Sequence, residues 1–183
     1  MICEDIMIDA KNFQTSETLK NGTAVAIRAV RPDDRELLVE AFRNLESETI
    51  YTRFFHHKSS LSEAELAMIT QLDFVKDVGL VVTVPGPERE IIIGAARYAV
   101  LQTDREGKTS AEVAFLVEED YQGQGIASRL LGHLIRIARE NGISCFEAEV
   151  LAGNTAMINV FKRCGLDVRT KYEGGEIHVN MPL

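Results

Sequence analysis

Residues 113–128 combine an apolar segment, a short acidic turn and a glycine-rich loop that leads into an amphipathic helix. Gly123 and Gly125 lack a Cβ atom, so the backbone at these positions can approach a bound group closely. The first N–H groups of a helix have no intrahelical acceptor and lie at the positive end of the helix dipole. Such a junction suits a phosphate or pyrophosphate. We therefore expect a nucleotide-bearing cofactor at residues 122–128.

The dinucleotide fingerprint G-x-G-x-x-G is one pattern that competes for this loop. It aligns with Gly123 and Gly125, but Ser128 stands where the third glycine is required. The fingerprint also requires an acidic residue about 20 positions later, at the end of a strand. Glu147 and Glu149 lie near that distance but inside an alternating segment. A plain glycine turn before a surface helix is the alternative without a ligand.

The second pattern, Q/R-x-x-G-x-G/A, is satisfied by Gln122, Gly125 and Ala127. It is the pyrophosphate loop for coenzyme A in the GCN5-related N-acetyltransferases (GNAT), and the chain resembles that family over roughly residues 23–183. The resemblance implies binding of acetyl-CoA as co-substrate. The loop residues that it assigns to the coenzyme are Gln122, Gly123, Gln124, Gly125, Ile126, Ala127 and Ser128.

Glu112 is a carboxylate within the apolar strand expected for residues 109–117. Carboxylates are seldom buried without a partner or a purpose. Residues 30–34 (VRPDD), 51–55 (YTRFF) and 111–114 (AEVA) resemble the catalytic domain of bacterial Pat-type protein lysine acetyltransferases. Those enzymes have a catalytic glutamate in this strand, which implies that Glu112 is the general base, directly or through water. The alternative is a surface residue on a solvated strand edge.

The resemblance also assigns roles to the end of this strand. It implies that residues 116–118 separate from the neighbouring strand and that Leu116 and Val117 pair with the amides of the pantetheine arm. The Val117 N–H group is then the candidate donor to the oxyanion. The alternative for Phe115 and Val117 is a purely structural place in the core.

Two residues of the expected helix over 154–161 complete the candidate coenzyme site. Asn154 resembles the family residue that hydrogen-bonds the pantetheine arm, and it is equally suited to cap the helix. Phe161 stands where the family often has a tyrosine that protonates the departing thiolate. Phenylalanine has no proton to donate, so we expect Phe161 to pack against the coenzyme. His56 and His57 have no third ligand in the sequence, and no metal site is expected.

Composition limits the classes of function. The 183 residues carry a formal net charge of −8, which argues against general binding of nucleic acid or anionic membranes. The three cysteines show no metal-ligand spacing and suggest reduced thiols. With no secretory signal and no apolar segment as long as a membrane span, we expect a cytoplasmic protein.

The pattern of apolar residues predicts an α/β (α+β) fold. Residues 1–22 are expected to be an N-terminal extension, flexible or irregular, before a single domain over 23–183. Strands and helices in mixed order imply a mixed, mostly antiparallel sheet of about seven strands flanked by helices. The expected strands are 23–30, 78–84, 91–101, 109–117, 144–151, 166–172 and 176–181, and helices are expected after Pro32, Ser47, Ser62, Gly125 and Asn154. Ser62 and Glu65 have the spacing of a capping box. The helix after Gly125 is expected to have one apolar face, made of Ile126, Leu130, Leu131, Leu134, Ile135 and Ala138.

The predicted function is an acetyl-CoA-dependent N-acetyltransferase in which an amine attacks the thioester directly. A protein lysine is the preferred acceptor, and a small-molecule amine is the alternative. A non-catalytic acyl-CoA-binding sensor is a further alternative, which the absent tyrosine at Phe161 favours and Glu112 disfavours. No nucleic-acid or membrane partner is expected, and the oligomeric state is left open, with a homodimer among the possibilities.

Overall fold

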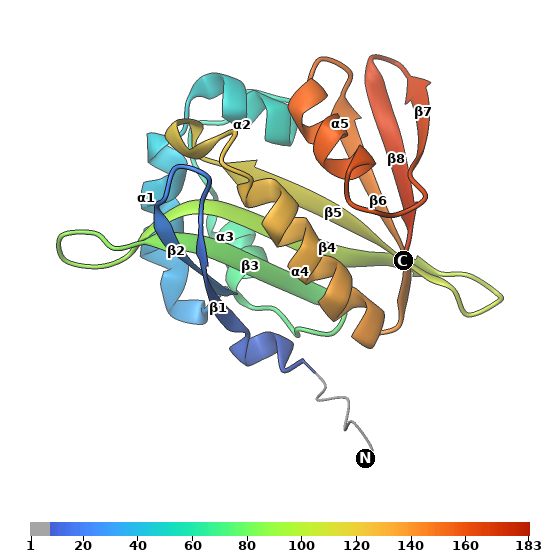
Figure 1. The fold of residues 1–183 in the computed structure, drawn as a ribbon, viewed down its shortest axis with the longest axis horizontal. Helices are drawn as coiled ribbons and strands as arrows, with labels where there is room; N and C mark the ends of the chain where they lie inside the picture. The colour runs from blue at the N-terminus through green and yellow to red at the C-terminus, as the bar shows by residue number, and fades with distance from the viewer. Residues whose placement is uncertain (1–7) are drawn as a thin grey trace.

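The computed structural model describes residues 8–183, which form one sheet with helices on both faces (Figure 1). The strands are β1 (Gln14–Thr18), β2 (Ala24–Ala29), β3 (Asp77–Val84), β4 (Ile91–Thr103), β5 (Thr109–Val117), β6 (Ile143–Leu151), β7 (Arg169–Glu173) and β8 (Glu176–Pro182). The helices are α1 (Arg35–Asn44), α2 (Ser47–Phe54), α3 (Glu63–Thr70), α4 (Ile126–Glu140) and α5 (Thr155–Lys162).

The eight strands follow the order β1-β2-β3-β4-β5-β6-β8-β7. Every neighbouring pair is antiparallel except β5 and β6, which are parallel and are joined by α4. A parallel pair needs a crossover connection, and the amphipathic α4 supplies it. The mixed, mostly antiparallel sheet predicted from the sequence is confirmed.

β1 is the strand that the sequence analysis did not expect. It pairs antiparallel with β2, and Gln14 lies opposite Arg28 at one end while Thr18 lies opposite Ala24 at the other. Its residues, QTSET, alternate between exposed and half-buried positions without a large apolar side chain, so no apolar period reveals the strand. Residues 14–18 are therefore part of the sheet and not an irregular lead-in. Residues 1–7 of the predicted extension lie outside the described residues.

The helices form two layers. α4 and α5 lie in front of the sheet in Figure 1, and α1 and α3 lie behind it. The buried residues of α4 are spaced as predicted and form a single apolar face, which comprises Ile126, Leu130, Leu131, Leu134, Ile135, Ile137 and Ala138. Burial of this face against β3–β6 fixes where the N-terminus of α4 lies. Ser62 caps α3 in the predicted capping box, in which its hydroxyl oxygen accepts from the Glu65 N–H group.

A buried ion pair joins β2 to the start of α1. Arg28 and Asp34 are 2% and 3% exposed, and the guanidinium of Arg28 donates to both carboxylate oxygens of Asp34 at 2.8 Å. Glu90, which precedes β4, is a second acceptor for the Nε atom of Arg28 at 3.1 Å. Burial is the largest single effect and opposes ionisation of Glu90, but the hydrogen bonds from Arg28 and Thr83 and the charge of Arg28 together outweigh it, and the pKa of Glu90 is lowered. The sequence pattern did not predict that Arg28 is buried.

Candidate active site

β5 and β6 separate part of the way along their length. Their parallel register ends where Glu112 lies opposite Glu147. β5 then continues to Val117 alongside β4, and β6 continues to Leu151 alongside β8. The separated ends border a cavity of about 1050 Å³, which also reaches α2, α5 and the loop before α4. The predicted separation of the strands is therefore present, and it begins well before residue 116.

The backbone of β5 directs alternate amide groups into this cavity. The Glu118 N–H group donates to the Ile93 carbonyl oxygen at 3.0 Å, toward β4. Because N–H groups alternate along an antiparallel strand, the N–H group of Leu116 also faces β4. Those of Phe115 and Val117 face the gap beside β6. The N–H group of Val117, the predicted oxyanion donor, therefore faces the gap, and that of Leu116 does not, although both residues line the cavity.

The two glutamines of the loop have different surroundings. The Nε2 atom of Gln122 donates to the Val117 carbonyl oxygen at 3.1 Å and to Oγ1 of Thr49 at 3.3 Å. Gln122 therefore ties the end of β5 to α2. The Oε1 atom of Gln124 accepts from the Asn21 N–H group at 3.0 Å, on the turn between β1 and β2. Gln124 is the predicted coenzyme residue that does not line the cavity.

The glycine loop ends in an open helix N-terminus. Gly123 and Gly125 have φ angles of +73° and +88°, a conformation that favours glycine. The Arg129 N–H group donates to the Gly125 carbonyl oxygen at 3.2 Å, so the N–H groups of residues 126–128 precede the regular helical bonds. Ile126, Ala127 and Ser128 line the cavity. Several backbone donors thus converge where an anion is expected.

α5 forms the wall opposite the glycine loop. The Oδ1 atom of Asn154 accepts from the Met157 N–H group at 3.1 Å, so Asn154 caps the helix and also lines the cavity. Phe161 is 1% exposed and lies edge-on to Phe115, with the ring centroids 5.9 Å apart. Both phenylalanines line the cavity, and this aromatic wall has no group that can donate a proton.

Glu112 lies where two cavities meet. It lines the cavity between β5 and β6, and it also lines a second cavity of about 450 Å³ on the sheet face opposite α4. Its side chain is exposed, so it is not the buried carboxylate on which the sequence argument rested. The solvated strand edge describes its surroundings better. Its position at the junction keeps Glu112 a candidate base, because an acceptor in one cavity could reach a thioester in the other.

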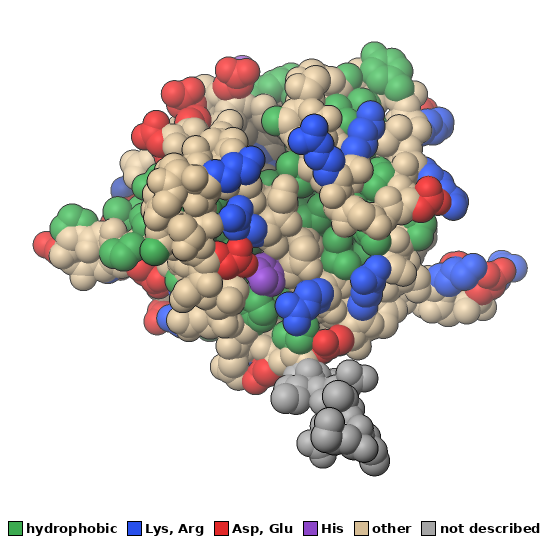
Figure 2. Space-filling model, viewed as in Figure 1, with side chains coloured by type: hydrophobic (Ala, Val, Ile, Leu, Met, Phe, Trp, Pro, Cys, Tyr) green, Lys and Arg blue, Asp and Glu red, His purple; other side chains and the backbone are tan. Residues whose placement is uncertain are grey.

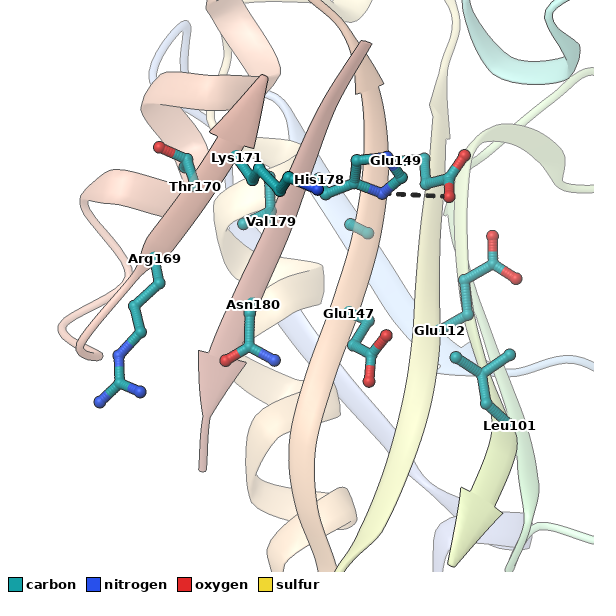
Figure 3. A pocket seen from close by; sticks show the side chains of 11 residues that line it. Leu101, Glu112, Glu147, Glu149, Arg169, Thr170, Lys171, His178, Val179 and Asn180 are labelled. Atoms are coloured by element: carbon teal, nitrogen blue, oxygen red, sulfur yellow. Dashed lines mark ion pairs between the residues drawn. The ribbon is translucent and has the colours of Figure 1, made fainter. Parts of the chain in front are cut away.

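The second cavity is predominantly acidic near the junction. Figure 3 shows Glu112, Glu147 and Glu149 on the neighbouring strands β5 and β6. The Nδ1 atom of His178, on β8, lies 3.2 Å from Oε1 of Glu149. Arg169 and Lys171, on β7, also line the cavity. A positively charged side chain would therefore be attracted toward the end of the cavity that holds Glu112.

α2 contributes side chains that the sequence analysis did not assign to the site. Tyr51 and Arg53 line the cavity between β5 and β6. Burial lowers the pKa of the Arg53 guanidinium, and the charge of Glu112 partly offsets this effect. Arg53 is therefore an electrostatic neighbour of Glu112. The segment 51–55 attracted notice only as a resemblance, because its helical spacing does not reveal which residues face β5.

Glu118 follows the separated end of β5. Its Oε2 atom is buried and has no hydrogen-bond partner among residues 8–183. Burial raises the pKa of Glu118, and the nearby carboxylates of Asp120 and Glu119 raise it further. Each effect favours the uncharged form of Glu118 beside the expected anion site.

Neither a metal cluster nor a membrane-spanning helix is found in the described part of the chain. Residues 8–183 contain no group of three or more His, Cys, Asp or Glu side chains placed to hold a metal ion. The Nδ1 atom of His56 is bound to the Phe54 carbonyl oxygen at 2.7 Å. No helix within 8–183 has the length and apolar character needed to cross a bilayer.

The fold and this cleft define a class of protein, and comparisons with known proteins identify it. An open α/β sheet whose one parallel strand pair separates beside a glycine-capped helix is the arrangement expected of an acyl-CoA-binding acetyltransferase. A sequence model of the acetyltransferase (GNAT) family matches residues 36–166. The chain belongs to this family.

The chain is also similar to individual members. It is 36% identical to the acetyltransferase Pat of Mycolicibacterium smegmatis. The alignment covers 80% of this chain but only 42% of the length of that relative. An acetyltransferase of Pseudomonas aeruginosa is 34% identical over 77% of this chain and 74% of the relative. The crystal structure of the GNAT domain of S. lividans PAT superposes with a TM-score of 0.81 at 35% identity, over 93% of this chain and 97% of that domain.

Proposed function

We propose that this chain transfers an acetyl group from acetyl-CoA to an amine, preferably the side chain of a lysine in a protein. The observation that carries the proposal is the cavity between β5 and β6. It begins at the open N-terminus of α4 and ends at Glu112, where it meets the second cavity, which has three glutamates in its lining. The family match and the similarity to two proteins named as acetyltransferases support this reaction.

The coenzyme would lie along the cavity. Its pyrophosphate would accept hydrogen bonds from the N–H groups of residues 126–128, where the helix dipole also favours an anion. Its pantetheine arm would pair with the N–H and C=O groups of Phe115 and with the C=O group of Val117, which face the gap. Asn154 and Phe161 line the opposite wall and would hold the arm against β5. This binding mode places the thioester near the inner end of the cavity.

The reaction would then proceed by direct attack. The amine nitrogen forms a bond to the carbonyl carbon of the thioester, and the carbonyl oxygen becomes an oxyanion. The Val117 N–H group is the proposed donor to that oxyanion. Collapse of the intermediate breaks the carbon–sulfur bond and releases the coenzyme thiolate. Glu112 accepts the proton that the amine loses, directly or through a water molecule, which its exposed position permits.

The departing thiolate needs little help from an acid. Free thiols have a pKa of about 8.5, so the thiolate is a tolerable leaving group near neutral pH. Phe161 cannot protonate it. Tyr51, on α2, carries a phenol that lines the same cavity, and water is the other proton source.

The acceptor side favours a cationic amine. Glu112, Glu147 and Glu149 line the second cavity at the end nearest the thioester, and their charges would attract an ammonium group. The cavity lies on strands β5–β8, whose side chains at this face are largely half-buried or exposed. A lysine side chain that projects from a protein surface could enter such an open groove. A small-molecule amine is the alternative acceptor.

Two variants test the role of Glu112. Glu112→Gln should lower turnover about 100-fold or more, measured as free thiol released from acetyl-CoA, with the coenzyme affinity nearly unchanged. Glu147→Gln is the matched control, because Glu147 lies directly opposite Glu112 but lines only the second cavity. The control should change turnover by only a few-fold. Equal turnover by Glu112→Gln and the wild type would reject Glu112 as the base.

The acceptor can be identified by its product. The chain is incubated with labelled acetyl-CoA and a cell lysate, and the acetylated proteins are located by mass spectrometry. Acetylated lysine residues would support a protein acceptor. Label found only on small amines would favour the alternative. A protein that binds acetyl-CoA but releases no thiol above background with any amine would be a sensor and not an enzyme.

A further inference from the structure

The turn between β1 and β2 packs directly against the glycine loop. The Lys20 Nζ atom donates to the Gly123 carbonyl oxygen at 3.3 Å, and the Asn21 N–H group donates to Oε1 of Gln124 at 3.0 Å. These residues are more than one hundred positions apart in the chain. The turn also lies outside residues 36–166, the part that the family model matches.

Arg129 connects the β1–β2 turn to the glycine loop through hydrogen bonds to both. Its Nη2 atom donates to the Thr18 carbonyl oxygen at 2.8 Å, and its Nη1 atom donates to the carbonyl oxygens of Gln124 and Gly125, both at 3.2 Å. Its Nε atom lies 2.7 Å from Oε2 of Glu17 on β1. The charge of Arg129 is thus used within the protein, and its role is to position the turn.

Lys20 has a different role from Arg129. It is exposed, it lines the cavity beside Gly123 and Gly125, and its ammonium group contacts a carbonyl oxygen instead of a carboxylate. A lysine ammonium has three donors on a flexible stem and can bind a phosphate as a point charge. Lys20 is therefore an exposed cation beside the N-terminus of α4, where the backbone donors converge.

Carboxylates around the cavity would repel the phosphates of a coenzyme, and the charge of Lys20 would offset part of this repulsion. The chain has a net charge of −8, and Glu46, Glu48 and Glu119 line the same cavity. Such carboxylates repel a coenzyme that carries several phosphate charges. Arg53 and Arg163 also line the cavity, and Lys and Arg side chains gather on the face that carries α4 and α5 (Figure 2). Among the described residues that line the cavity, Lys20 is the cation that contacts the glycine loop.

We propose that Lys20 is a coenzyme-binding residue, and that its ammonium group pairs with the pyrophosphate held at the N-terminus of α4. The β1–β2 hairpin is then a functional part of the coenzyme site. This inference rests on the proposed function, because it requires a coenzyme in the cavity. Since the expected contact is a charge-assisted hydrogen bond at an exposed position, its removal should weaken coenzyme binding about 3- to 10-fold.

Calorimetry with acetyl-CoA tests the inference. Lys20→Gln should raise the Kd about 3- to 10-fold, and Lys20→Arg should retain most of the affinity. Lys108→Gln removes an exposed lysine from the β4–β5 turn and should leave the Kd unchanged. The difference between Lys20→Gln and the wild type should shrink at high salt. An unchanged Kd for Lys20→Gln would overturn the inference.

The phosphate group can be assigned with a truncated coenzyme. If Lys20 contacts the pyrophosphate, Lys20→Gln should weaken the binding of 3′-dephospho-CoA by the same factor as the binding of CoA. Loss of the effect with 3′-dephospho-CoA would overturn the assignment and place Lys20 at the 3′-phosphate. If the wild type itself does not bind acetyl-CoA, the proposed function fails. If the wild type and Lys20→Gln bind acetyl-CoA with equal affinity, only the inference about Lys20 fails.

Discussion

Replacement of Gly125 by alanine tests how the anion site is built. Gly125 has a φ angle of +88°, and a Cβ atom added there would lie 2.6 Å from Nη1 of Arg129. A side chain in the left-handed region costs about 1–2 kcal/mol. Arg129 must also shift, which weakens its hydrogen bonds to the carbonyl oxygens of the loop and of Thr18, by about 1 kcal/mol in total. The expected loss of unfolding free energy is about 2–3 kcal/mol.

Gly107→Ala is the matched control. Gly107 lies in the β4–β5 turn with a φ angle of +81°, and a Cβ atom there would have no heavy atom within 4 Å. This variant should show the backbone cost alone, about 1–2 kcal/mol. Urea unfolding measures both variants, and unchanged m-values show that the two-state comparison holds. Acetyl-CoA affinity should fall about tenfold or more in Gly125→Ala, because the loop amides move, and should not change in Gly107→Ala.

The reasoning would be refuted by equal stability losses in the two variants together with unchanged coenzyme affinity. Such a result would mean that Arg129 adapts freely and that the loop amides do not depend on its position. Loss of affinity without additional loss of stability would show that the amides matter but that Arg129 does not hold them.

Two further predictions concern stability. Asp34→Ala leaves Arg28 buried without its bidentate partner and should lower the unfolding free energy by about 3–5 kcal/mol in urea titrations. The control Asp167→Ala removes an exposed ion pair and should change the unfolding free energy by less than about 0.5 kcal/mol. Similar losses in the two variants would contradict the argument. The hydrogen bond from Lys58 and the bonds at the start of α3 lower the pKa of Glu65 to about 2, so its contribution to stability is present above its ordinary pKa of 4.5 and is lost as the pH falls toward 2. The stability difference between wild type and Glu65→Gln should shrink over that range in acid titrations, and a constant difference would count against this assignment.

Features that depend on neighbouring residues in the chain were predictable. The apolar face of α4 and the capping box at Ser62 are encoded within a few residues, and the structure confirms both. The strand, the acidic turn and the glycine loop were also predictable, because they follow one another within a short segment of the sequence. The mixed sheet followed from the order of these elements.

Features that depend on distant partners were not predictable. β1 has no apolar period, and only its pairing with β2 makes it a strand. The different roles of Leu116 and Val117 follow from the register of β5 against β4, which a single sequence does not give. Lys20 reaches the site through contacts with residues far along the chain. The exposure of Glu112 was left open between a buried and a solvated position, because the gap between β5 and β6 could not be seen from the residues alone.

The early end of the β5–β6 register has a mechanical consequence. The sheet consists of two wings, β1–β5 and β6–β8–β7, which are joined at a seam where Thr109–Glu112 face residues 143–147. A bound pantetheine arm would act as a substitute strand and connect the wings beyond this seam, so amide protection in the second half of β5 should rise. Release of the spent coenzyme would then require those added bonds to break, and flexing at the seam would help to set the rate of turnover.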